Sequence, residues 1–139
     1  MNKLNFDPNY NGNLHLGKLL KLPYAVNFTN NGHVWLGNLK TIPAGTKFNN
    51  NGSVWLSNLI ELPEGIEFNN KGNIWLHNIK TLPKEFKFNN EGYLYLPILN
   101  YEGLSYEQFM YIYPKLYTDK QNELKWLLRQ FKIKRILYE

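Results

Sequence analysis

A unit of twenty residues recurs along most of the chain, and this repeat constrains the fold more than any other feature of the sequence. Phenylalanine, glycine and proline return at fixed positions of the unit. A period between about twenty and fifty residues is typical of solenoids, in which each unit buries its apolar face against its neighbours. The sequence therefore predicts a stack of coils. The recurring residues are Phe28, Phe48, Phe68 and Phe88; Gly12, Gly32, Gly52, Gly72 and Gly92; and Pro23, Pro43, Pro63 and Pro83.

Each unit contains two short segments that alternate as β-strands do. In one of them Val54 and Leu56 share a face and Trp55 points the other way. We therefore predict a mainly β fold, a parallel β-solenoid of about five coils over residues 1–99, with residues 1–21 as a degenerate N-terminal cap coil. The predicted inward-facing residues of one coil are Val54, Leu56, Leu59, Leu62, Ile66 and Phe68.

The recurrent glycines and asparagines predict how the coils turn. Glycine at the position of Gly52 predicts a positive φ, a conformation that other residues adopt only at a cost. Asparagine amides at corners can bond the backbone of their own coil and of the adjacent coil, so they predict stacked ladders. The candidate ladder residues are Asn30, Asn50, Asn70 and Asn90, together with Asn38, Asn58 and Asn78.

The repeat also resembles known families. The pattern Leu-x-x-Leu-Pro, preceded by Val-x-Leu and an asparagine, resembles the short leucine-rich repeats of bacterial proteins. The run Phe-Asn-Asn-x-Gly-x-Val-Trp-Leu is similar to repeats of phage and bacterial proteins, and the resemblance covers residues 12–99. The spacing differs in one respect, because Asn58 follows Leu56 by two residues where the usual leucine-rich repeat has three. Proline and glycine leave no room for a helical convex side, so a compact solenoid is expected rather than a horseshoe.

The period ends before residue 100, and residues 100–139 are predicted to form a C-terminal helical cap. Ser105 with Gln108, and Thr118 with Gln121, have the spacing of capping boxes, so a helix is expected to begin at each. An apolar stripe on the second helix is expected to cover the open end of the solenoid, since uncovered strand edges invite aggregation. The stripe consists of Leu124, Leu127, Leu128 and Phe131.

Composition and motifs argue against several classes of function. The chain has no cysteine, and its three histidines lie at different positions of the repeat without acidic residues at ligand spacing, so no metal or other cofactor is expected. No phosphate-binding glycine loop, nucleophile elbow or acid–base pair is visible, so we expect no enzymatic activity. Without an apolar run long enough for a signal peptide or a membrane span, we expect a cytoplasmic protein that does not associate with membranes.

A column of aromatic residues is the candidate binding site. The column residues lie between inward-facing neighbours and so point outward on successive coils, about 4.8 Å apart. Exposed apolar patches of this size are rare on monomers, and tryptophan and tyrosine dominate protein interfaces. We therefore predict a protein-binding face, and the residues predicted as its charged rim are Lys47, Lys87, Arg129, Lys132 and Arg135. A column stabilised by its own stacking, a column covered by the C-terminal helices and a homodimer remain alternatives. The column consists of His15, Trp35, Trp55, Trp75 and Tyr95.

The second candidate site is a basic C-terminal tail in a chain of net charge +5. An amphipathic basic helix can bind an acidic partner or RNA, so nucleic-acid binding is an alternative function. In the repeats, by contrast, the outward position occupied by Lys47, Glu67 and Lys87 alternates in charge, which favours ion pairs between coils over a phosphate-binding track. The basic residues of the tail are Lys125, Arg129, Lys132, Lys134 and Arg135.

These features favour a non-enzymatic protein-interaction module that works through the aromatic column. The resemblance to phage repeats implies a more specific hypothesis, a phage-encoded inhibitor of a bacterial defence complex such as a CRISPR effector, that is, an anti-CRISPR protein. A carbohydrate-binding protein or a phage structural accessory protein is a third alternative, because aromatic columns also stack on sugars.

Overall fold

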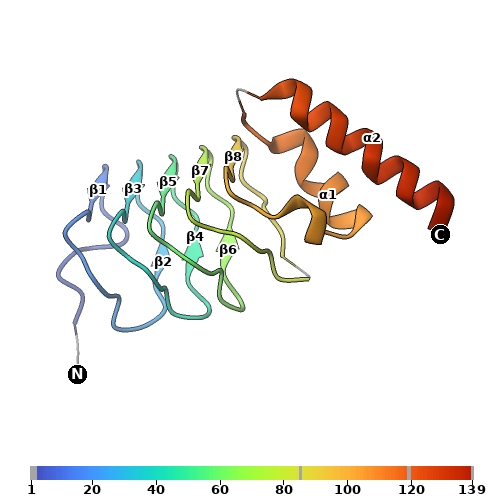
Figure 1. The fold of residues 1–139 in the computed structure, drawn as a ribbon. Coiled ribbons are helices and arrows are strands. Elements are labelled where there is room, and N and C mark those ends of the chain that lie inside the picture. Colours follow the sequence, from blue (N-terminus) through green and yellow to red (C-terminus); the bar gives the residue numbers. More distant parts are fainter. Residues whose placement is uncertain (1–2, 85, 119, 139) are drawn as a thin grey trace.

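The computed structural model shows a parallel β-solenoid of about four turns followed by C-terminal helices, as the repeat predicts (Figure 1). The structure describes residues 3–84, 86–118 and 120–138. Residues 1 and 2 of the predicted N-terminal cap coil, and residues 119 and 139 of the predicted helical cap, lie outside the described residues. The predicted fold class is confirmed.

The strands form two parallel sheets, and the chain crosses from one to the other within each coil. Strands pair with a shift of twenty residues, as Val34 opposite Val54 and Phe48 opposite Phe68 illustrate. An isolated bridge between Phe68 and Phe88 continues the second sheet into the next coil. The first sheet contains β1 (Leu14–His15), β3 (Val34–Trp35), β5 (Val54–Trp55), β7 (Ile74–Trp75) and β8 (Leu94–Tyr95); the second contains β2 (Asn27–Phe28), β4 (Lys47–Phe48) and β6 (Glu67–Phe68).

The core lies between the two sheets and runs the length of the solenoid. All six residues predicted to face inward in one coil are buried. Within the core, phenylalanine rings of successive coils stack face to face, with 5.0 Å between the centroids of Phe28 and Phe48 and 5.2 Å between those of Phe48 and Phe68. Burial of one large apolar side chain contributes about 1.5–3 kcal/mol. Because each ring is buried against rings of the neighbouring coils, the coils stabilise one another.

The recurrent glycines are required by contact between coils, and the predicted positive φ was wrong for most of them. Among the described glycines, positive φ angles occur at Gly45 (83°), Gly65 (72°) and Gly12 (158°), the last close to extended backbone. A Cβ on Gly52, however, would lie 2.7 Å from the carbonyl carbon of Gly32 in the preceding coil. The same close approach recurs at Gly32, Gly72 and Gly92.

Half of the predicted asparagine ladders are confirmed. Asn30, Asn50, Asn70 and Asn90 are buried, and each donates from Nδ2 to a backbone carbonyl of the preceding coil. The bond from Asn70 Nδ2 to Gly52 O, for example, is 3.0 Å long. These amides therefore cross-link successive coils at one corner. The other predicted ladder residues, Asn38, Asn58 and Asn78, lie exposed at turns.

The C-terminal helices are η1 (Tyr101–Gly103), α1 (Tyr106–Ile112), η2 (Tyr113–Lys115) and α2 (Gln121–Tyr138). The predicted capping box at Ser105 is confirmed, since Ser105 Oγ accepts from Gln108 N and Gln108 Oε1 accepts from Ser105 N. At the second predicted box the bonds differ, because Thr118 Oγ1 accepts from Lys120 N and its carbonyl accepts from the Gln121 side chain. As a result α2 begins at Gln121, three residues after Thr118.

The segment before α2 closes the C-terminal end of the solenoid. Leu116 forms a parallel bridge with Leu94, so the edge of β8 is paired. The Tyr111 hydroxyl donates to Phe88 O at 2.9 Å and accepts from Phe88 N at 3.1 Å. Lys115 Nζ donates to Phe88 O at 3.1 Å and to Asn90 O. These bonds satisfy backbone groups that a further coil would otherwise pair.

Helix α2 forms the outermost layer at this end, with α1 between it and β8 (Figure 1). Of the predicted apolar stripe, Leu124 and Phe131 are buried, and Leu127 and Leu128 pack partly buried against the core. The ring of Phe131 stacks on that of Phe109 in α1, with 4.2 Å between centroids and 9° between planes. Helix α2 is thus held by its predicted inner face.

Candidate functional site

The aromatic column, defined as His15, Trp35, Trp55, Trp75 and Tyr95, forms on the outer surface of the first sheet, as the alternation predicts. The first four rings stack nearly parallel, with successive centroid separations of 4.2, 4.8 and 6.2 Å and interplanar angles of 9°, 16° and 10°. Tyr95 meets Trp75 edge to face, at 5.3 Å and 64°. Aromatic pairs in such geometries contribute about 0.5–1.5 kcal/mol each beyond their area. The column is therefore an ordered strip of rings.

His33 lines one side of the column and is fixed by the backbone. Its ring meets Trp35 at 5.3 Å and 63°, and Trp55 at 5.3 Å and 79°. His33 Nδ1 accepts from the backbone N–H of Ser53 at 2.8 Å, so this nitrogen carries no proton. The same bond recurs between other coils, since Ser53 Oγ accepts from Asn73 N and Asn73 Oδ1 accepts from Tyr93 N. His33 is thus one rung of a ladder of acceptors that joins successive coils.

The C-terminal end of the column is covered by residues from outside the repeat. Tyr117 meets Trp75 at 6.2 Å and Tyr95 at 6.0 Å, in both cases edge to face. His77 meets Tyr95 at 4.9 Å and 76°. Trp75 Nε1 and His77 Nδ1 are buried here, and neither has a hydrogen-bond partner among the described residues. This end is therefore a packed aromatic cluster.

The rings of the column are neither all exposed nor all covered, so the column combines an exposed face with the self-stacking and the coverage that the sequence left open as alternatives. His15 is exposed, and Trp35, Trp55, Trp75 and Tyr95 are partly buried. Self-stacking and coverage by Tyr117 each hide part of the rings. Tyr117 packs on Trp75 and Tyr95, so the strip that stays partly exposed is formed by His15, Trp35 and Trp55 on β1, β3 and β5, the strands farther from the helices (Figure 1).

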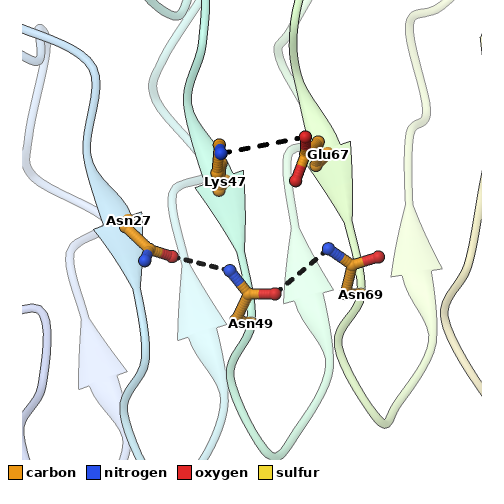
Figure 2. Close-up of polar contacts among 5 residues, drawn as sticks. All are labelled: Asn27, Lys47, Asn49, Glu67 and Asn69. Atoms are coloured by element: carbon orange, nitrogen blue, oxygen red, sulfur yellow. Dashed lines mark hydrogen bonds and ion pairs between the residues drawn. The ribbon is translucent and has the colours of Figure 1, made fainter.

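The two rim lysines that lie in the repeats do not adjoin the column, because they lie on the side of the other sheet. Lys47 lies on β4, and Lys87 occupies the equivalent position one coil beyond β6. Figure 2 shows the face on which Lys47 lies: its Nζ is 3.8 Å from Glu67 Oε1, which confirms the predicted pairing between coils. Beside this pair an amide ladder runs from Asn69 to Asn49 to Asn27, with bonds of 3.1 and 2.7 Å.

The basic tail is a third, separate surface on α2. All of its predicted residues are exposed: Lys125, Arg129, Lys132, Lys134 and Arg135. Two of them also contact rings of the helical region, since the guanidinium of Arg135 lies 4.3 Å from the centroid of Tyr106 and Lys134 Nζ lies 5.9 Å from that of Phe131. Such cation–π contacts orient the side chains without neutralising their charge.

Burial shifts the pKa of two titratable groups at the junction between the solenoid and the helices. Burial, reinforced by the nearby Glu123 carboxylate, raises the pKa of Tyr101 to about 12. Burial also lowers the pKa of Lys115. Both shifts follow from the packing of the helices onto the last coil.

Within the part of the chain that the structure describes, no group of three or more His, Asp or Glu residues could hold a metal ion. Nor is any described helix long and apolar enough to cross a membrane.

Sequence reasoning missed three residues that surround the column. His33 and His77 could have been found, because each lies two residues from a column tryptophan and so shares its outward face. Tyr117 had no such signal, since it follows the end of the repeat and reaches the column only through the path of the chain.

No protein-family model, curated protein or solved structure matches this chain. The resemblance to short leucine-rich repeats thus stays a prediction, whereas the solenoid itself is seen directly in the strand pairing.

Proposed function

We propose that this protein is a non-enzymatic, cytoplasmic interaction module that binds a protein partner through the aromatic column. The observation that carries the proposal is the row of stacked rings His15, Trp35 and Trp55, which stays partly exposed, whereas Tyr117 packs on Trp75 and Tyr95 at the other end of the column. Tryptophan is enriched among the residues that contribute most to binding at protein interfaces, so partly exposed tryptophans in a row fit a binding face.

The rigidity of the site supports this function. Each ring of the strip belongs to a strand paired with its neighbours, and His33 is fixed by its bond from Ser53 N. Few side-chain rotamers are therefore lost when a partner binds, which lowers the entropic cost of association. A surface of this kind acts by occlusion, because it covers a partner's surface without changing its own shape.

The more specific form of the proposal is a phage-encoded inhibitor that occludes a bacterial defence complex, such as a CRISPR effector. It rests on the resemblance of the repeats to phage and bacterial repeat proteins. In this form the column would cover a surface that the complex needs for its own substrate.

A pull-down from nuclease-treated bacterial lysate tests the proposal. Wild-type protein is compared with the double variant Trp35→Ala, Trp55→Ala, which removes both tryptophans of the strip, away from Tyr117. The expected result is a protein that the wild type retains and the variant loses. A matched control, Tyr24→Ser with Ile60→Ser, removes two exposed apolar side chains elsewhere on the repeats and should retain it.

Thermal melting of each variant separates loss of binding from loss of fold. If the column variant melts as a folded protein and captures the same proteins as the wild type, the column is not the binding face. Capture that requires nucleic acid and ignores the tryptophans would instead support nucleic-acid binding by the basic tail.

A further inference from the structure

Helix α2 carries a second apolar stripe on the face turned away from the protein. Trp126, Ile133 and Leu137 are 54%, 42% and 65% exposed. At 100° per residue they lie within about 40° of one another around the helix axis, and roughly 150° from the buried residues Leu124 and Phe131. The helix is therefore apolar on two faces, only one of which is used inside this chain.

The outer stripe has the spacing of a coiled-coil seam. Trp126, Gln130, Ile133 and Leu137 are separated by four, three and four residues, so they occupy successive d, a, d and a positions of a heptad. Gln130 places one amide within the seam. A polar residue at a single a position is compatible with helix pairing, because it can bond across the pair and fix its register.

Positive charge flanks the stripe on both sides. In this register Arg129 is a g position and Lys134 an e position, the positions from which paired helices form ion pairs. Among the described residues, no carboxylate lies within ion-pair distance of either side chain. Helix α2 as a whole carries five basic residues and one acidic residue. The seam is therefore complementary to a helix with acidic flanks.

From the stripe and its flanks together, we infer that the outer face of α2 binds an amphipathic helix of a partner protein whose e and g positions are acidic. A second copy of this chain fits poorly. In a parallel pair, Arg129 of one helix faces Lys134 of the other, and in the antiparallel pair that aligns the stripes, Arg129 faces Ile136. Neither arrangement offers an acidic residue to these charges.

Two other anionic occupants are also disfavoured. A lipid surface would bury the amide of Gln130 among hydrocarbon without a partner, at a cost of several kcal/mol. Nucleic acid would engage the basic side chains but would leave Ile133 and Leu137 exposed to water. An acidic helix alone uses the apolar stripe, the central amide and both flanking charges. This site is separate from the aromatic column and does not depend on the function proposed for it.

The test uses a synthetic probe, because the partner is unidentified. The probe is a labelled three-heptad peptide with glutamate at e and g, whose like charges disfavour self-pairing, and with leucine at a and d except for one central asparagine at an a position, which can bond the Gln130 amide. A second peptide carries lysine at e and g. Fluorescence anisotropy with the full-length protein should show saturable binding of the acidic peptide, with a Kd on the order of micromolar, and no binding of the basic peptide.

Three double variants distinguish the effect of the stripe and its flanking charges on peptide binding from the effect of net charge. Ile133→Asp with Leu137→Asp should weaken binding of the acidic peptide by about tenfold or more. Arg129→Glu with Lys134→Glu should transfer binding to the basic peptide. Lys125→Glu with Lys132→Glu is the matched control, because it makes the same change in net charge on the same helix, away from the stripe, and should keep the wild-type preference.

Several results would overturn the inference. The acidic peptide could fail to bind at concentrations of about 1 mM, or the two charge-reversal variants could weaken binding equally, which would make net charge the cause. Self-association abolished by Ile133→Asp, without peptide binding, would identify a second copy as the occupant. Stripe-dependent sedimentation with anionic vesicles, without peptide binding, would identify a lipid surface. Preferred binding of a single-stranded oligonucleotide that survives the Ile133→Asp, Leu137→Asp change would identify nucleic acid.

Discussion

Replacing Gly52 by alanine should destabilise the solenoid strongly, because the added methyl group has no space between two coils. Its Cβ would lie 2.7 Å from the carbonyl carbon of Gly32, whereas ordinary van der Waals contact begins at 3.4 Å. The His33 ring, whose Nδ1 would lie 2.5 Å away, would also have to move, but its movement cannot relieve the contact with the Gly32 backbone. Relief requires the two coils to separate locally by roughly 0.7 Å.

The cost of that separation can be worked out from the contacts at this position. Forced overpacking costs about 1–3 kcal/mol. Separation of these two coils also weakens the bonds that join them here, from Asn50 Nδ2 to Gly32 O at 3.0 Å and from Ser53 N to His33 Nδ1 at 2.8 Å. A weakened hydrogen bond adds about 1 kcal/mol. We expect a total loss of about 3 kcal/mol, which corresponds to a fall in Tm of roughly 10 °C for a domain of this size.

Gly37→Ala is the matched control, since no atom lies within 4 Å of the position that its Cβ would take and its φ is not in the left-handed region. This substitution should change the free energy of unfolding by no more than about 1 kcal/mol, in the stabilising direction. Thermal melting of the two variants by circular dichroism measures the difference. If Gly52→Ala melts within about 2 °C of Gly37→Ala, close contact between coils is not the reason for the recurrent glycine.

Other predictions follow from the ladder and the C-terminal junction. Asn70→Ala should cost roughly 2–3 kcal/mol in urea unfolding, because it removes the amide that donates to three backbone carbonyls, whereas Asn78→Ala at an exposed turn should be near neutral. Tyr101 has a folded-state pKa of about 12 against an ordinary value of 10.0, so the unfolded chain releases this proton first and stability falls as pH rises between these values. Tyr101→Phe should make alkaline unfolding less steep; an unchanged slope would contradict the shift. Lys115→Met should speed hydrogen exchange of amides in the last coil and leave the central coils unchanged, because its Nζ donates only at that end.

Much of the fold follows from sequence because the repeat makes each coil the neighbour of an equivalent coil. Val54 and Trp55 point to opposite faces in any strand, and the period places Trp35 and Trp75 beside Trp55 once the coils stack. The pairing of Lys47 with Glu67 follows in the same way. Such contacts depend only on local alternation and on a constant shift of twenty residues.

Three features could not be read from the sequence, because they depend on distances and positions in space. The role of Gly52 depends on how closely two backbones approach, and alternation contains no information about that distance. The position of Tyr117 over Trp75 depends on the path of a non-repeating segment. The separation of Lys47 from the aromatic column depends on which sheet each strand joins.

Helix α2 shows most clearly which features follow from the sequence and which require the tertiary structure. The sequence by itself determined that a helix lies near Gln121 and that Leu124 and Phe131 share a face, because both follow from local spacing. Only the tertiary structure decided that this face meets α1 and that Ile133 is left outside. The physical reason is that periodicity fixes the direction in which a side chain points, whereas burial depends on which distant part of the chain packs there.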